Sequence, residues 1–198
     1  MSSGPHRALK RSTMKYPSRA QALDLLNIHQ VPEHIIRHSM VVTHVANVIA
    51  SALVKSGVDL DEDLVDRAAL LHDICKMKAI TSGGDHALFG NELLTSMGYP
   101  LVGDIIGQHV WLKSFELGEA MVVNYADKRV MHDRIVSIPE RFEDLMTRYG
   151  TDELRRSRIS THHENTLKVH GIIAASTRED LLDLWNLNLV SRDQTLYG

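Results

Sequence analysis

The chain has 198 residues, of which 43% are hydrophobic and 24% are charged, and its formal net charge at pH 7 is −3. This balance is typical of a globular domain and excludes a disordered chain and a collagen-like repeat. The net charge by itself does not suggest a nucleic-acid binder. No apolar stretch approaches the roughly 20 residues of a membrane span. The single cysteine, Cys75, cannot form an intramolecular disulfide. We therefore expect a cytoplasmic protein with no membrane partner and no clear nucleic-acid partner.

The first part of the chain differs in charge from the rest. Five basic residues and no acidic residue precede Asp24. This composition predicts a flexible basic tail over residues 1–17, followed by one domain over residues 18–198.

The spacing of apolar residues predicts helices nearly throughout this domain. Helices are expected over residues 18–28, 32–57, 59–78, 86–97, 100–109, 116–132 and 139–150, with C-terminal helices continuing to residue 190. Residues 81–85 have the composition of a loop. No repeat and no useful alternating strand pattern is present. The predicted fold is all-α, a single-domain helical bundle.

A polar group interrupts the apolar run at the end of the helix expected over residues 59–78. His72 and Asp73 follow Leu70 and Leu71, and Lys76 comes three residues after Asp73. On a continuous helix this spacing places the three side chains near one face. Burying them together is costly unless they are paired or bind a ligand. A metal ion would satisfy the first two, and Lys76 would suit a phosphate. The alternative is an ordinary ion pair at a helix end.

Two further polar residues interrupt apolar helices in the same way. His38 lies within His-Ser-Met-Val-Val, and Asp127 lies within Val-Val-Asn-Tyr-Ala-Asp-Lys. A histidine, then His-Asp, then a distant aspartate resembles the pattern of the HD superfamily of metal-dependent phosphohydrolases. The segment Leu-Leu-His-Asp-Ile-Cys-Lys at 70–76 is similar to the central motif of that family. The resemblance covers core motifs within residues 34–130 and implies an HD-type helical bundle.

Two additional histidines match family members that bind two metals. His86 begins His-Ala-Leu-Phe-Gly, and His109 ends Ile-Ile-Gly-Gln-His. The resemblance then implies a dinuclear site bridged by Asp73, with the ligands His38, His72, Asp73, His86, His109 and Asp127. Nitrogen and oxygen ligands suit iron, manganese, zinc or cobalt. We expect one or two such ions per chain, with two favoured.

The resemblance implies hydrolysis of a phosphate ester or anhydride, in a nucleotide or a similar small molecule, by a metal-bound hydroxide. Asp73 and Lys76 are the expected catalytic residues, and Lys76, Lys128 and Arg129 are expected to neutralise substrate phosphate. Three alternatives stay open. They are a mononuclear site without His86 and His109, a nucleotide-sensing module without turnover, and a dinuclear-iron oxygenase. The sequence is compatible with a homo-oligomer and does not name the substrate.

Two other motifs resemble parts of the cyclic-dinucleotide phosphodiesterases. Gly98-Tyr99-Pro100 and His162-His163-Glu164 occur here in the reverse of that family's order. We interpret Gly98 as a helix stop and His162-His163 as polar surface.

Overall fold

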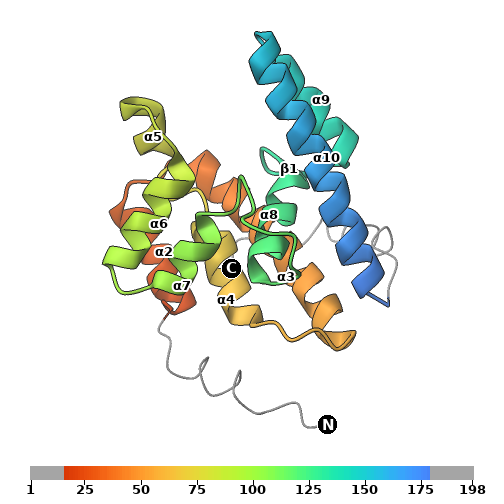
Figure 1. The fold of residues 1–198 in the computed structure, drawn as a ribbon. Helices are drawn as coiled ribbons and strands as arrows, with labels where there is room; N and C mark the ends of the chain where they lie inside the picture. Colours follow the sequence, from red (N-terminus) through yellow and green to blue (C-terminus); the bar gives the residue numbers. More distant parts are fainter. Residues whose placement is uncertain (1–15, 179–198) are drawn as a thin grey trace.

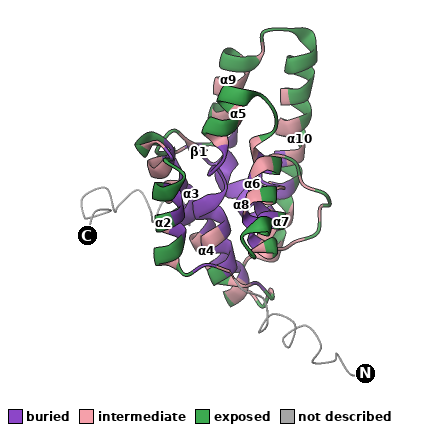
Figure 2. Ribbon diagram, turned by 90° about the vertical axis from the view of Figure 1, so that its left-hand side faces the viewer, coloured by how far each residue is buried: buried purple, intermediate pink, exposed green. Residues whose placement is uncertain are grey.

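In the computed structural model, which describes residues 16–178, the long helix α3 (Glu33–Lys55) runs through the middle of the molecule (Figure 1). It begins after Pro32 and ends before Gly57, whose φ of 94° suits a glycine at a helix end. It packs against α4 (Glu62–Leu71) and α8 (Glu119–Lys128). Figure 2 shows buried residues concentrated on these three helices, which form the core.

Short polar side chains set the starts of the surrounding helices. Ser18 and Gln21 form a reciprocal capping box at the start of α2 (Arg19–Ile28). The Asp61 carboxylate accepts a hydrogen bond from the Leu64 amide at the start of α4, 3.0 Å away. Asp85 caps α6 (His86–Ser96) in the same way through the amides of Ala87 and Leu88. These caps fix where each helix begins, and in α6 the first helical residue is His86.

Helices α6 and α7 (Pro100–Ile106) pack closely because glycine occupies their contact. A Cβ atom at Gly103 would lie 2.7 Å from Thr95 Oγ1 and 2.9 Å from the carbonyl oxygen of Asn91. Only a residue without a side chain allows this approach.

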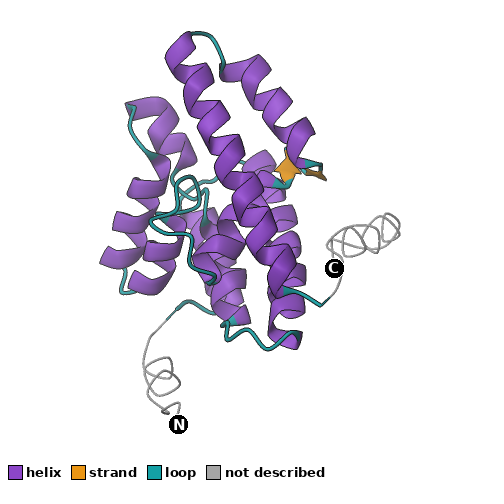
Figure 3. Cartoon of the chain, turned by 45° about the vertical axis from the view of Figure 1, so that its right-hand side comes forward, coloured by secondary structure: helices purple, strands orange, loops and turns teal. Residues whose placement is uncertain are grey.

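The C-terminal part begins with a short hairpin. Strands β1 (Val130–Met131) and β2 (Arg134–Ile135) pair antiparallel, and His132 in the turn has a φ of 57°. Helices α9 (Ile138–Tyr149) and α10 (Glu153–Ser176) follow and lie side by side. Figures 1 and 3 show that this α9–α10 hairpin extends beyond the rest of the bundle. Among the described helices, none combines the length and apolar character of a membrane span.

The all-α prediction is confirmed, but two helix predictions are wrong in their bounds. The helix expected over 59–78 ends at Leu71, and a separate helix α5 (Lys76–Ser82) follows a turn. The helix expected over 116–132 covers only α8, because the chain turns at Arg129 into the hairpin. The predicted tail over 1–17 lies almost wholly outside the described residues, as does the helix expected beyond residue 178.

The close α6–α7 contact can be tested with two alanine substitutions. We expect Gly103→Ala to lower the free energy of unfolding by about 1–3 kcal/mol, because the new Cβ meets backbone that cannot rotate away. Gly171→Ala on exposed α10 is the matched control, since nothing lies within 4 Å of its Cβ position. That change should be neutral or stabilising by about 0.5–1 kcal/mol. Urea denaturation measures both, and equal stability of the two variants would contradict the contact.

Candidate metal centre

The central His-Asp pair lies in the turn that separates α4 from α5. Two successive tight turns form it, with the Ile74 amide bonded to the Leu71 carbonyl and the Lys76 amide bonded to the Asp73 carbonyl, each at 3.0 Å. The side chains of His72 and Asp73 are both buried. The turn therefore directs two consecutive polar side chains into the interior.

The other four predicted ligands come from four separate elements. His38 lies in α3, His86 is the first residue of α6, His109 follows α7, and Asp127 lies in the last turn of α8. The imidazole rings form a row, with centroids 5.4 Å apart for His38 and His72, 5.0 Å for His72 and His109, and 4.8 Å for His86 and His109. The fold thus gathers all six predicted ligand residues into one cluster.

The two carboxylate oxygens of Asp73 face different pairs of histidines. Oδ2 lies 3.5 Å from His72 Nε2 and 3.9 Å from His38 Nε2. Oδ1 lies 3.3 Å from His86 Nε2 and 3.7 Å from His109 Nε2. Asp73 is therefore placed between two groups of ligand atoms.

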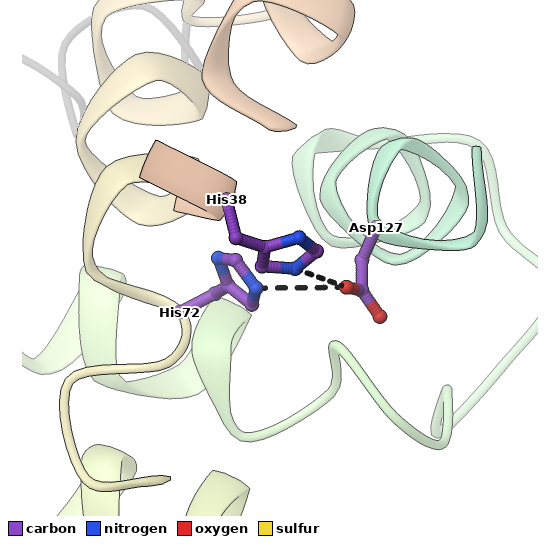
Figure 4. A group of neighbouring side chains, drawn as sticks. All are labelled: His38, His72 and Asp127. Carbon is purple, nitrogen blue, oxygen red and sulfur yellow. Dashed lines mark hydrogen bonds and ion pairs between the residues drawn. The ribbon is translucent and has the colours of Figure 1, made fainter. Parts of the chain in front are cut away.

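Asp127 completes the first of these groups (Figure 4). Its Oδ1 lies 3.1 Å from His38 Nε2 and 3.6 Å from His72 Nε2, and Figure 4 shows both rings directed at this oxygen. One ligand atom from each of His38, His72 and Asp127 lies within 4.8 Å of the other two. The same holds for His72, Asp73 and His109, and every residue of these two sets is buried.

Backbone carbonyls fix the orientation of three of the rings. Nδ1 of His38 donates to the carbonyl of His132 at 2.7 Å, Nδ1 of His72 to that of Ala69 at 2.7 Å, and Nδ1 of His109 to that of Ile106 at 2.6 Å. A carbonyl can only accept, so Nδ1 carries the proton in each case. The Nε2 lone pair is then available to a metal ion, which is the arrangement usual for histidines that bind metals.

The cluster also contains polar atoms that the described residues leave unsatisfied. His72 Nε2 and Asp73 Oδ1 are buried and have no hydrogen-bond partner within residues 16–178. His86 Nε2 and His109 Nε2 approach within 2.9 Å, although both can act as acceptors. Unsatisfied buried polar atoms are costly. A divalent cation would satisfy them, so these residues fit the metal that the sequence pattern implies.

Burial and neighbouring charges shift the pKa values of the candidate ligands, and at His72 the aspartates Asp73 and Asp127 raise the pKa against the effect of burial. Burial and the nearby His72 lower the pKa of His109 to about 3, so this ring is neutral at physiological pH. Burial works to raise the pKa of both aspartates, but their neighbours together lower both values well below the usual one. His72 makes the largest lowering contribution at Asp73, and Lys128 makes the largest at Asp127. Neutral imidazole and ionised carboxylate are the forms that bind metals.

The three predicted basic residues lie in different positions. Lys76 Nζ lies 2.5 Å from Asp73 Oδ2 and is partly exposed. Lys128 is buried and donates to Asp127 Oδ2 at 2.5 Å and to the His109 carbonyl at 2.9 Å. Arg129 points toward the β-hairpin, where it donates to the Val136 carbonyl at 2.8 Å and to the Tyr125 hydroxyl at 3.1 Å. Lys76 and Lys128 line the site, and Arg129 is not brought to it.

A cleft of about 730 Å³ opens over the cluster. Five of the six predicted ligand residues line it, together with side chains from the α9–α10 hairpin. His72 is fully buried behind them.

The interpretation of His162 as polar surface is wrong. His162 lines the cleft and stacks on Trp111 at 4.6 Å between ring centroids. Burial and the nearby Lys128 lower its pKa to about 3. A sequence signal was present, because His162 shares a three- and four-residue spacing with the partly or fully buried Ile159, Thr166, Val169 and Ile173.

Known proteins with similar sequences include an archaeal protein and bacterial ribonucleases. An uncharacterized protein of Methanocaldococcus jannaschii is 26% identical over 144 residues, which are 64% of this chain and 84% of that protein. Ribonuclease Y of Clostridium perfringens is 30% identical over 127 residues, and that of Clostridium novyi is 33% identical over 96. These matches cover 59% and 48% of this chain but only 24% and 18% of the two ribonucleases.

No solved structure matches the chain significantly. The family model of the HD domain matches residues 35–132, a range that holds all six predicted ligand residues. The family and the geometry agree, and the chain belongs to the HD-domain superfamily of metal-dependent phosphohydrolases.

Proposed function

We propose that this protein is a phosphohydrolase with a dinuclear metal centre, which cleaves a phosphate ester or anhydride of a small molecule. The observation that carries the proposal is the position of Asp73. Its two oxygens face two separate histidine pairs, at 3.5 and 3.9 Å on one side and 3.3 and 3.7 Å on the other. A carboxylate between two groups of nitrogen ligands suits a bridge between two ions.

The ligand atoms divide naturally between two positions. His38, His72 and Asp127 would hold one ion, His86 and His109 would hold the other, and Asp73 would serve both. Paired ions of this kind lower the pKa of a bound water and clamp phosphoryl oxygens. The histidines and carboxylates of the chain supply the fixed geometry that this chemistry requires.

The two lysines have different roles in this proposal. Lys76 is partly exposed in the cleft. Burial works to lower its pKa, but the charges of Asp73 and Asp127 and the hydrogen bond to Asp73 together raise it. It is therefore charged at neutral pH and can bind a phosphate oxygen of the substrate. Lys128 is buried, and its two hydrogen bonds position the Asp127 carboxylate and the backbone carbonyl of His109.

The cleft favours a small phosphorylated substrate such as a nucleotide. Its volume of about 730 Å³ lies within the range of small-molecule sites. The similarity to ribonuclease Y makes an RNA phosphodiester a second candidate substrate. A panel of nucleotides, sugar phosphates, generic phosphodiesters and a short RNA oligonucleotide would separate these classes. Oxygen consumption without phosphate release would favour an oxygenase, and binding without turnover would favour a sensing module.

The dinuclear centre predicts a graded loss of metal. Plasma mass spectrometry of the purified wild-type protein should find about two transition-metal ions per chain. Asp73→Ala should lose both ions, because it removes the shared ligand. His86→Ala should lose about one, because it removes a ligand of the second position only. One ion in the wild type and no change in His86→Ala would favour a mononuclear site.

The role of Lys76 predicts loss of rate without loss of metal. Lys76→Met should lower kcat by about 10²-fold or more, a loss typical of removing a group that stabilises transition-state charge. Metal content should be unchanged. Lys78→Met, two residues further along α5, is the matched control because Lys78 is exposed and packs over Phe89 outside the cleft. A metal-free Lys76→Met protein would show that Lys76 has a structural role.

A further inference from the structure

The α9–α10 hairpin forms one wall of the cleft that opens over the candidate metal ligands. It contributes Arg141, Leu145, Arg148, Tyr149, Ile159 and His162 to the lining. All six follow residue 132, so the match to the HD domain does not extend to this wall.

Arg141 is the least satisfied cation of this wall. Its side chain is only 14% exposed, and its Nε is buried without a hydrogen-bond partner among the described residues. The nearest carboxylate oxygen is Asp144 Oδ2, which lies 3.5 Å from one terminal nitrogen and is bonded more closely to Arg148. The Arg141 guanidinium thus has donor capacity that the protein leaves unused.

The other cations of the cleft have closer partners. Lys76 and Lys128 each lie 2.5 Å from a carboxylate oxygen, and Arg37 lies 2.6 Å from Glu33 Oε1. Arg141 lines the same cleft as Lys76 and Lys128. Gathering like charges beside a buried site costs free energy unless an anion offsets it.

We propose that Arg141 binds a phosphate group of the substrate from the α9–α10 wall of the cleft. A guanidinium presents paired donors that match two oxygens of one phosphate, and such charge-assisted bonds are strong in a partly buried site. Arg141 takes the role for which Arg129 was the sequence-based candidate. The inference rests on the proposed function, because the bound phosphate belongs to the molecule that is hydrolysed.

The experiment is a calorimetric titration of the full-length purified protein with inorganic phosphate. Arg141→Met should weaken phosphate binding by about tenfold or more, as expected for the loss of a charge-assisted bond. Arg141→Lys should recover part of the affinity, because it restores the charge without the paired donors. Arg155→Met is the matched control, since Arg155 lies in the same hairpin, pairs with Asp152 and is exposed. It should bind phosphate like the wild type.

Thermal unfolding and metal content of each variant separate binding from structure. Arg141→Met should keep the wild-type metal content and a Tm within a few degrees of the wild type. The inference is overturned if the wild type binds no phosphate, if Arg141→Met binds it as tightly as the wild type, or if Arg155→Met loses as much affinity. Phosphate binding that depends on Arg141 in a protein that hydrolyses nothing would support this inference and contradict the proposed function.

Discussion

The buried carboxylate of Asp73 is the group on which the geometry of the site depends. The turn between α4 and α5 holds His72 and Asp73 and directs both side chains into the interior. It places Asp73 between two pairs of imidazoles, with each oxygen committed to one pair.

The remaining parts of the fold hold the ligands around this carboxylate. The left-handed turn at His132 supplies the carbonyl that orients His38, although the two residues lie 94 positions apart in the sequence. The glycine contact at Gly103 brings α7 close to α6 and so sets His109 beside His86. Backbone groups and close helix packing, more than side-chain bonds, provide the precision that metal ligands need.

The six candidate ligand residues named from the sequence lie together in the structure. His38, the His72-Asp73 pair and Asp127 are polar residues within apolar patterns, where burial demands an explanation, whereas His86 and His109 were added from the family resemblance. The sequence did not predict the break after Leu71, because Leu70 to Ile74 is apolar on both sides of the pair and contains no glycine or proline. It also could not decide which basic side chain reaches the cleft. Arg129 bonds to the β-hairpin, and only the packing of α9 reveals that Arg141 lines the cleft instead.

The order of these parts along the chain has an evolutionary consequence. Every proposed metal ligand precedes residue 132, whereas one wall of the cleft is encoded after it, in the α9–α10 hairpin. On the proposed function, mutations in that one contiguous segment would alter substrate recognition without changing the candidate metal ligands. Relatives that share the ligands can therefore diverge in specificity, and similarity within the HD domain is a poor guide to the molecule on which each one acts.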